Sequence, residues 1–321
     1  MTEETAKSHR ARPKIVVVAG PTGSGKTGLG VELGKCFGGE VINADSRYLY
    51  RGFDIGTAKP TLSEREGVPH YLIDILAPDD DFSLARYQEL AYQTIDDVVQ
   101  RERLPLLVGG TPLYIKAVIE GWQIPRVPPD PEIRARLEAE RAEHGVERLI
   151  ERLTAIDPAS AVRCGVNPRR IIRALEVYEV TGVPMSELED KGPRPFDTLE
   201  LGLWRDRGAL YTAIDQRIDR QIDDGLVGEV EQLLASGVPA TAPAFSSIGY
   251  RQLLPAIAGE ESLAEGIARI RHDTHRYVRH QETWLRANPR LIRIDVDQAG
   301  WIDDCAARVA AFLAAPDTGP F

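Results

Sequence analysis

A glycine-rich stretch near the start of this 321-residue chain limits its possible folds more than any other feature. The stretch reads Gly20-Pro-Thr-Gly-Ser-Gly-Lys-Thr27 and matches the phosphate-loop pattern G-x-x-x-x-G-K-[ST] at every position. It follows the β-branched run KIVVVA and precedes the helical sequence GLGVELGKCF, a strand–loop–helix context that disfavours a chance glycine turn. The residues expected to surround phosphate oxygens are Gly20, Pro21, Thr22, Gly23, Ser24, Gly25, Lys26 and Thr27.

Two side chains of this loop carry specific chemistry. Lys26 supplies a positive charge, and the Thr27 hydroxyl is the expected Mg²⁺ ligand. The chain contains no N-K-x-D or T-K-x-D guanine motif, and apart from Asp45 no predicted buried strand ends in an obvious Walker-B aspartate. The loop therefore indicates phosphate binding, without the usual apparatus for hydrolysing a nucleoside triphosphate.

Strands that alternate with helices predict an α/β fold, with a P-loop NTPase-like core whose parallel sheet is flanked by helices. Between residues 125 and 195 the sequence shows only helical periodicity between proline-rich edges, which predicts a helical insertion domain. The domains expected are a tail at 1–12, a core formed by 13–124 and 196–321, and the insertion at 125–195. The strands expected are 14–19, 40–45, 104–110, 199–204 and 291–297, and helices are expected at 83–101, 112–121, 208–236, 249–257 and 261–287.

The composition narrows the setting. No apolar run approaches the roughly 20 residues of a spanning helix, the N-terminus has no signal-like apolar stretch, and the three cysteines have no His partners at metal-ligand spacing. These features favour a cytoplasmic protein without a membrane partner, and we take a monomer as the default. The net charge of −10 argues against nucleic acid, but 32 of the 39 basic residues are arginines, so their distribution matters more than the total.

Asp45 follows the second predicted strand, at the sheet edge where ligands of open α/β folds bind. From position alone it is a metal ligand, a general base or the cap of a turn. The glycine-punctuated stretch Arg51–Pro60 after it is either a functional loop or a plain solvated connection.

Six motifs, taken in their order along the chain, resemble those of the tRNA isopentenyltransferase family, the bacterial tRNA dimethylallyltransferases. They are GPTGSGKT, NADSRYLYRGFDIGTAKP, VPHYLIDI, LLVGGTPLYIKAVIEG, NPRRIIRALEVY and SIGYRQL, and the similarity covers about residues 14–286. The segment 45–60 is the most specific of them, because a generic P-loop kinase would not carry it.

The resemblance implies transfer of a five-carbon prenyl group from dimethylallyl diphosphate to the N6 amine of the adenine at position 37, just 3′ of the anticodon, in tRNAs that read codons beginning with U. It also implies a P-loop kinase-like core and Mg²⁺ as cofactor. By the same resemblance Asp45 is the general base, Thr111 lies near the reacting amine, and Arg217 helps Lys26 bind the diphosphate. For Arg217 alone a surface salt bridge is the commoner explanation, and the family more often has methionine at or near Gln221.

Family positions that contact the tRNA anticodon stem-loop fall on three segments and on two single residues, Thr111 and Arg134. The matching residues are Asp45, Ser46, Arg47, Tyr48, Thr111, Arg134, Asn167, Pro168, Arg169, Arg170, Ile171, Ser247, Ile248, Gly249, Tyr250, Arg251 and Gln252.

Two segments concentrate positive charge despite the acidic total. Residues 163–173 have four arginines and no acid, and residues 269–293 have seven arginines, three histidines and two acids. Helical spacing places Arg269, His272, Arg276, Arg279 and Arg286 on one face, and Ile270, Thr274, Tyr277, Gln281 and Trp284 on a packing face. This charge pattern fits an RNA-binding surface, and it also fits a solvated face that neutralises acidic neighbours.

Histidines at two positions of the second segment replace family arginines. If His275 and His280 hold phosphates, RNA binding weakens as the pH rises past about 6.5.

Three rival functions remain at this stage. A prenyltransferase of free adenine nucleotides would not need the insertion or the basic helix. A small-molecule kinase would not need the segment 45–60. A nucleotide-gated switch would need a guanine motif and a switch-type acid, and this sequence has neither.

Overall fold

The computed structural model describes residues 12–316, so the tail predicted at residues 1–12 lies almost wholly outside the described residues. The chain divides into two compact units. One comprises residues up to Ile119 together with those from Pro195 onward, and the other is the insertion Glu120–Arg194. Within residues 12–316 no helix is both long and apolar enough to cross a membrane.

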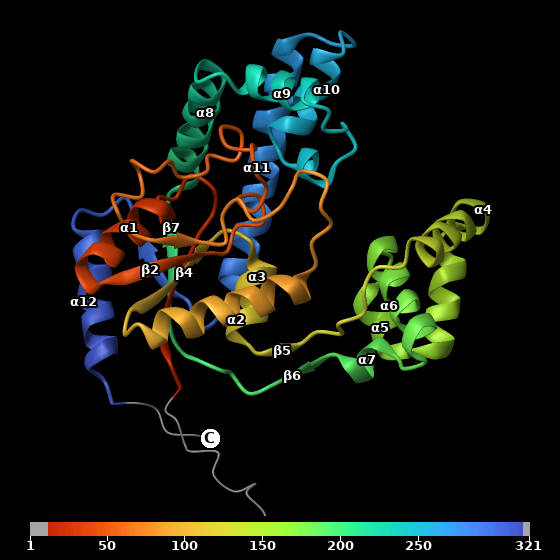
Figure 1. Ribbon diagram of the computed structural model, residues 1–321, viewed down its shortest axis with the longest axis horizontal. Coiled ribbons are helices and arrows are strands. Elements are labelled where there is room, and N and C mark those ends of the chain that lie inside the picture. The colour runs from red at the N-terminus through yellow and green to blue at the C-terminus, as the bar shows by residue number, and fades with distance from the viewer. Residues whose placement is uncertain (1–11, 317–321) are drawn as a thin grey trace, which may run out of the picture. The chain divides into compact units, whose positions relative to one another are not determined.

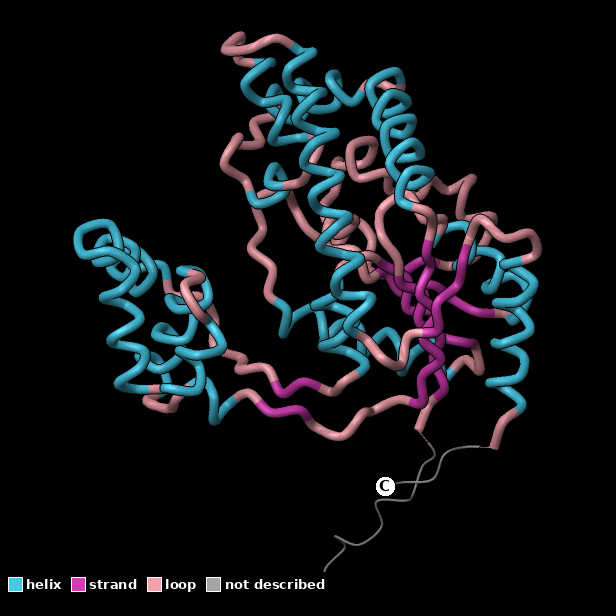
Figure 2. The backbone as a smooth tube through the Cα atoms, turned by 180° about the vertical axis from the view of Figure 1, so that it is seen from behind, coloured by secondary structure: helices cyan, strands magenta, loops and turns pink. Residues whose placement is uncertain are grey.

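A six-stranded parallel sheet forms the centre of the first unit, as the alternating pattern predicts (Figure 2). Its strand order is β3-β2-β4-β1-β7-β8, and β1 pairs with β4 through Ala19 and Gly109 and with β7 through Ala19 and Gly202. The strands are β1 (Lys14–Ala19), β2 (Gly39–Asn43), β3 (His70–Tyr71), β4 (Leu104–Gly109), β7 (Asp197–Trp204) and β8 (Ile292–Asp295).

Alternate residues of β1 enter different hydrophobic layers, so both faces of the sheet are covered. Val16 and Val18 belong to one hydrophobic cluster, with Leu29 and Val309, whereas Ile15 and Val17 belong to another, with Tyr87 and Leu210. The helices of this unit are α1 (Lys26–Phe37), α2 (Leu84–Gln100), α3 (Pro112–Ile119), α8 (Arg207–Asp223), α9 (Leu226–Ala235), α10 (Tyr250–Ile257), α11 (Leu263–Ala287) and α12 (Trp301–Ala314), with a 3₁₀ turn at Pro243–Ser246 (Figure 1). Ser83 caps α2, because its hydroxyl accepts a bond from the Arg86 N–H at 3.2 Å.

Several sequence expectations are wrong in detail. The single helix expected at 208–236 is two, because Gly225 has a φ of 101°, which interrupts the helix between α8 and α9. The strand expected to reach Asp45 ends at Asn43, whose side-chain oxygen accepts the Asp45 N–H. The two-residue strand β3 and the helix α12 were not expected.

The second unit is helical, as predicted, apart from a short antiparallel pair between β5 (Trp122–Gln123) and β6 (Asp190–Lys191), which the sequence analysis did not expect. Its core lies between α4 and α6 and includes Leu149 and Leu175. The helices are α4 (Pro131–Ile156), α5 (Pro158–Cys164), α6 (Pro168–Thr181) and α7 (Met185–Leu188).

A buried carboxylate fixes the start of α4 in this unit. Glu176 is fully buried and accepts bonds from Arg134 Nε at 2.7 Å, Arg173 Nη1 at 2.7 Å and the backbone N–H of Asp130 at 2.8 Å. Burial raises the pKa of Glu176, but these bonds outweigh it, so its pKa lies below the ordinary value. Arg134, the isolated RNA contact expected in the insertion, is therefore held in a defined orientation by an ion pair.

Replacing Glu176 with alanine is expected to destabilise the insertion by about 2–3 kcal/mol, since it leaves the Asp130 N–H and two guanidinium groups without their acceptor. Water solvates part of the charge because the Arg134 side chain is 43% exposed, which limits the loss. The effect is measured by chemical denaturation, with hydrogen exchange of residues 120–194 as the readout of unfolding. Glu138→Ala, which breaks only the exposed pair with Arg141, should change stability by less than about 0.5 kcal/mol; equal effects would contradict a structural role for Glu176.

Candidate active site

The phosphate loop joins β1 to α1 at the carboxyl edge of the sheet. Gly23 and Gly25 have φ values of 82° and 87°, a conformation that glycine adopts without strain and that turns successive N–H groups inward. Lys26 starts α1 and donates a hydrogen bond from Nζ to the carbonyl oxygen of Pro21 at 2.7 Å. Burial lowers the pKa of Lys26 to about 8, with Arg217 acting in the same direction and the carboxylate of Asp45 opposing them.

Asp45 lies two residues beyond β2 and uses its two carboxylate oxygens differently. Oδ1 accepts the backbone N–H of Arg47 at 3.0 Å and so caps the turn. A Cβ added to Gly110 would lie 3.7 Å from Asp45 Oδ2 and 3.5 Å from the Gly20 carbonyl oxygen. Of the three roles left open by the sequence, the structure therefore shows the turn cap at Oδ1, while Oδ2 lies near the first residue of the predicted phosphate loop.

Thr111 anchors the segment that follows Asp45. Its side-chain oxygen accepts the Ser46 N–H at 3.0 Å, and its own N–H donates to the Ala44 carbonyl at 3.1 Å. These bonds tie the residues on both sides of Asp45 to the end of β4.

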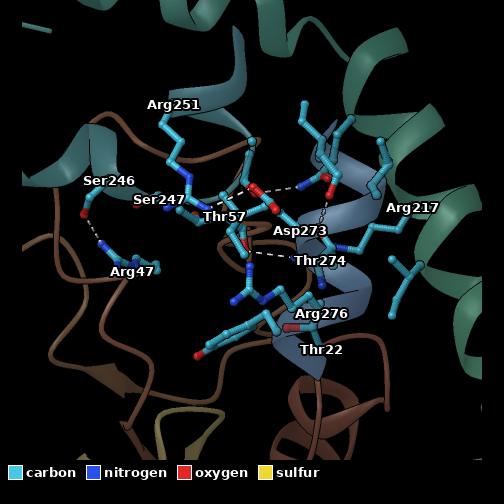
Figure 3. A pocket seen from close by; sticks show the side chains of 18 of the residues that line it. Thr22, Arg47, Thr57, Arg217, Ser246, Ser247, Arg251, Asp273, Thr274 and Arg276 are labelled. Atoms are coloured by element: carbon cyan, nitrogen blue, oxygen red, sulfur yellow. Dashed lines mark hydrogen bonds and ion pairs between the residues drawn. The ribbon is translucent and has the colours of Figure 1, made fainter. Parts of the chain in front are cut away.

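A cavity of about 460 Å³ lies beside Asp45 and Thr22, a residue of the predicted phosphate loop. Figure 3 shows Thr22 together with other residues that line this cavity. Thr22 and Asp45 line one part of it, and Arg217 reaches it from α8. The Arg217 guanidinium donates to the Thr57 carbonyl oxygen at 3.0 Å, and within residues 12–316 it forms no ion pair that would explain it as a surface salt bridge. Further lining residues are Ser46, Arg47, Ser246, Ser247, Ile248, Gly249, Arg251, Ile270, Asp273, Thr274, Arg276, Tyr277 and His280.

The second part of the wall comes from residues after the 3₁₀ turn. Arg47 Nη1 donates to Ser246 Oγ at 2.9 Å, so the Asp45 segment and this turn meet at the cavity (Figure 3). Arg251 is exposed and pairs with Asp273 at 2.9 Å. Arginine side chains from the Asp45 segment, α8, α10 and α11 therefore border one cavity.

Four of the residues expected to contact RNA have buried side chains: Ser247 is 1% exposed but borders the cavity, and the other three have structural tasks. Tyr250 is fully buried and its hydroxyl hydrogen-bonds with Glu229 and the Gly56 N–H, while Gln252 is 3% exposed and is held by Asp273 and the Gly249 N–H. Ile171 is fully buried in the insertion core. The expectation is revised for these three, because they position neighbouring residues and do not present their side chains to solvent.

In the same predicted segments other side chains are accessible. Asn167, Arg169 and Arg170 are exposed at the start of α6, and Pro168 is half-buried. Asn167 also caps α6 by accepting the Arg170 N–H at 3.4 Å.

The metal expected at Thr27 would have few protein ligands. Among the described residues no group of three or more His, Cys, Asp or Glu side chains could hold a metal ion. Thr27 is at the start of α1 and borders a small cavity of about 20 Å³ beside Tyr48. Burial raises the pKa of Tyr48 to about 12, so its phenol stays neutral there. This donor set fits Mg²⁺, which keeps several waters and binds through one or two protein oxygens together with substrate phosphates.

The basic helix α11 only partly matches the two faces expected of it. Ile270, Thr274 and Gln281 are buried, as predicted, whereas Tyr277 is 38% exposed and borders the cavity. On the basic face Arg276 lines the cavity, but Arg269 pairs with Glu261 and Arg286 with Glu282.

His275 does not fit the expected phosphate contact. Its ring stacks on Tyr211, with 4.1 Å between ring centroids, and its Nε2 lies 3.0 Å from Asp215 Oδ1. The hypothesis of a pH-dependent phosphate contact therefore applies to His280 alone, which is exposed and lines the cavity.

Sequence analysis missed a glutamine that joins the separate parts of the site. Gln281 of α11 accepts the Thr22 N–H at 3.1 Å and donates to the Gly110 carbonyl at 2.8 Å. Helical spacing places Gln281 on the packing face of α11. A carboxamide on a buried face needs hydrogen-bond partners, and this need was the signal in the sequence that Gln281 bonds to other parts of the chain. Gln221, Glu229 and Asp273 were missed in the same way, because their partners lie far away in the sequence.

The sequence of the chain is similar to those of known proteins over most of its length. The family model described as IPP transferase matches residues 48–288. The chain is 52% identical to the tRNA dimethylallyltransferase of Thermomicrobium roseum over 303 residues, 94% of this chain and 92% of that protein. It is 47% identical to the enzyme of the same name from a Roseiflexus species, over 93% of this chain and 98% of the relative.

Solved structures are similar as well. The full-length tRNA isopentenylpyrophosphate transferase from Bacillus halodurans has a TM-score of 0.71 and 37% identity, covering 94% of this chain and 97% of that one. A eukaryotic dimethylallyltransferase solved acting on tRNA has a TM-score of 0.79 and 27% identity, covering 93% and 78%.

Proposed function

Because the chain belongs to the IPP transferase family, we infer that it is a tRNA dimethylallyltransferase. It transfers the dimethylallyl group of dimethylallyl diphosphate to the N6 amine of the adenine at position 37 in tRNAs that read codons beginning with U, and releases diphosphate. The observation that carries this proposal is the single cavity lined by both Thr22 of the phosphate loop and Asp45. A diphosphate and a nucleobase amine can meet there.

Stabilising the leaving group is the main electrostatic task, since cleavage at the allylic carbon leaves negative charge on diphosphate. The backbone N–H groups of Gly23, Gly25, Lys26 and Thr27, at the N-terminus of α1, are the donors proposed for that charge, since the Thr22 N–H bonds to Gln281 and the Ser24 N–H to the Pro21 carbonyl. Lys26 can exchange its bond with the Pro21 carbonyl for one with the diphosphate. Arg217 borders the cavity that Thr22 and Asp45 line. Thr27 would hold Mg²⁺, which supplies further positive charge to the diphosphate oxygens when bound.

The acceptor amine must lose a proton, because the exocyclic nitrogen of adenine is a weak nucleophile. Asp45 Oδ2 is the general base in this proposal: it takes the proton as the new C–N bond forms and the C–O bond to diphosphate breaks. The bond from the Arg47 N–H to Oδ1 holds the carboxylate in place. The base must leave the stack to enter the cavity, as in other base-modifying enzymes.

RNA contacts are assigned to accessible side chains and backbone of the predicted segments. Around the cavity these are Ser46, Arg47, Ile248 and Arg251, and in the insertion they are Arg134, Asn167, Pro168, Arg169 and Arg170. Arginine suits this task because its planar guanidinium both pairs with phosphate and stacks on bases.

Incubating the full chain with unmodified tRNA, labelled dimethylallyl diphosphate and Mg²⁺ tests the function. Label should appear in the anticodon loop, and an anticodon stem-loop should compete with whole tRNA. Label on free adenine nucleotides instead would favour a nucleotide prenyltransferase, and consumption of ATP without prenyl donor would favour a kinase. We expect a monomer, which sedimentation of the same sample measures.

Diphosphate binding should weaken as the pH rises through about 8. The pKa of Lys26 is lowered from the ordinary 10.5 to about 8, so its positive charge is present below this pH and lost above it. From pH 7 to pH 9 roughly 90% of the cation is lost, and we expect pyrophosphate affinity to fall by up to about tenfold. Titration calorimetry with pyrophosphate and Mg²⁺ measures the affinity.

The matched control is Lys26→Arg, which stays charged throughout and corrects for titration of pyrophosphate itself. Its affinity should vary less between pH 7 and 9 than that of the unchanged protein. Identical pH profiles for the two proteins would show that Lys26 does not titrate in this range.

A further inference from the structure

The loop formed by residues 54–59 is held by side chains from three helices. Glu229 of α9 accepts the backbone N–H of Ile55 at 2.9 Å, and the Tyr250 hydroxyl of α10 accepts that of Gly56 at 3.1 Å. Gly56 has no room for a side chain, because an added Cβ would lie 2.4 Å from the Tyr250 ring. The loop therefore lies tightly against these helices, and Gly56 and Thr57 form part of the cavity wall.

Three consecutive carbonyl oxygens of the same loop bond to side chains of α8. The Gln221 side-chain N–H₂ donates to the Ile55 carbonyl at 2.6 Å and the Gly56 carbonyl at 3.0 Å, and Arg217 donates to the next carbonyl, that of Thr57, at 3.0 Å. Arg217 and Gln221 are four residues apart, so they lie on the same face of the helix. Two side chains thus bind three consecutive carbonyls.

Gln221 is 8% exposed and borders the cavity beside Arg217. Its nitrogen makes both bonds, so a residue of similar size that cannot donate would lose them together. Thr57 O, the acceptor that orients Arg217, directly follows the two carbonyls that Gln221 holds.

We propose that Gln221 is a positioning residue for the diphosphate donor: by fixing the carbonyls of Ile55 and Gly56 it sets Thr57 O, which aims the Arg217 guanidinium into the cavity. This inference rests on the proposed role of Arg217 in diphosphate binding. Methionine, common in the family at or near this position, packs with a similar volume but donates no hydrogen bond.

Gln221→Met tests the proposal in steady-state assays with both substrates varied. We expect the KM for dimethylallyl diphosphate to rise about three- to tenfold, as for loss of one or two hydrogen bonds, with kcat and the KM for tRNA changed less than twofold. Gln221→Asn, whose amide is one carbon shorter, should behave alike. The control Gln232→Met changes an exposed glutamine of α9 and should leave all three constants unchanged.

A double-mutant cycle with Arg217→Ala separates the possible outcomes. If Gln221 acts through Arg217, Gln221→Met adds less than a twofold rise in donor KM once Arg217 is absent. Independent, multiplying effects in the cycle, or an unchanged donor KM in both Gln221 variants, would overturn the positioning role while leaving the function intact. An Arg217→Ala variant with unchanged donor KM and pyrophosphate affinity would remove Arg217 from the diphosphate site and the inference with it.

Discussion

Asp45→Asn is expected to slow prenyl transfer by about 10²–10⁴-fold, because the amide cannot accept the proton that the adenine amine loses. Asparagine keeps the size of the side chain and an oxygen for the Arg47 N–H, so the turn should persist. Single-turnover reactions of pre-bound tRNA with labelled donor measure the chemical step. At pH 7 pyrophosphate affinity should stay within about threefold of the unchanged protein.

Asp45→Ala distinguishes proton transfer from geometry. Alanine also removes the cap at Arg47, so it should be at least as slow as the asparagine variant and should lose some stability. Asp79→Asn, on an exposed loop, serves as the control and should react at the normal rate. Equal labelling by all of these proteins would remove Asp45 from the mechanism.

The same substitution has a second consequence at Lys26. The Asp45 carboxylate raises the pKa of that lysine, although burial dominates and lowers it overall. Without the carboxylate the pKa falls further, so pyrophosphate affinity in Asp45→Asn should begin to decline at lower pH than in the unchanged protein. A calorimetric titration series across pH 6–9 measures this shift, and coincident profiles would show that the two side chains do not interact.

The predicted phosphate loop and Asp45 could be located from the sequence because each belongs to a segment that is local in sequence. The phosphate loop is defined by eight adjacent residues, and Asp45 follows a strand whose apolar run is short and clear. In a parallel sheet the carboxyl ends of β1, β2 and β4 meet at one edge, so these residues had to lie close together.

The supporting half was not predictable in the same way. Thr22 and Gln281 are separated by 259 positions, and Ile55 and Gln221 by 166, so no local pattern relates them. A buried glutamine signals that some partner exists but does not identify it. By contrast, Arg286 and its partner Glu282 are four residues apart on α11, so that ion pair could have been predicted from helical spacing alone.

Gly109→Ala is expected to be the most damaging substitution that changes no functional group. A Cβ at this position would lie 2.2 Å from both the carbonyl carbon and the carbonyl oxygen of Ala44, and backbone atoms cannot move aside as a side chain could. The strand end at Ala44 must shift, which strains its bonds to Val108 O and the Thr111 N–H. We expect a loss of stability of about 3 kcal/mol or more in urea denaturation.

Activity should fall further than stability explains, because Asp45 directly follows the displaced residue. A misplacement of about 1 Å at a reacting group costs on the order of 10²-fold in rate, so the folded fraction of Gly109→Ala should react at least that much more slowly. Gly110→Ala gives a graded comparison: its Cβ would meet the flexible end of Gln281 at 2.8 Å, which can give way, so its stability loss should be smaller. Gly228 lies in α9, and a Cβ added there would have no atom within 4 Å. Gly228→Ala should therefore fold normally, and its free energy of unfolding should rise by about 0.5–1 kcal/mol. A Gly109→Ala protein as stable and active as Gly228→Ala would show that β2 and β4 do not hold Asp45 by this close backbone contact.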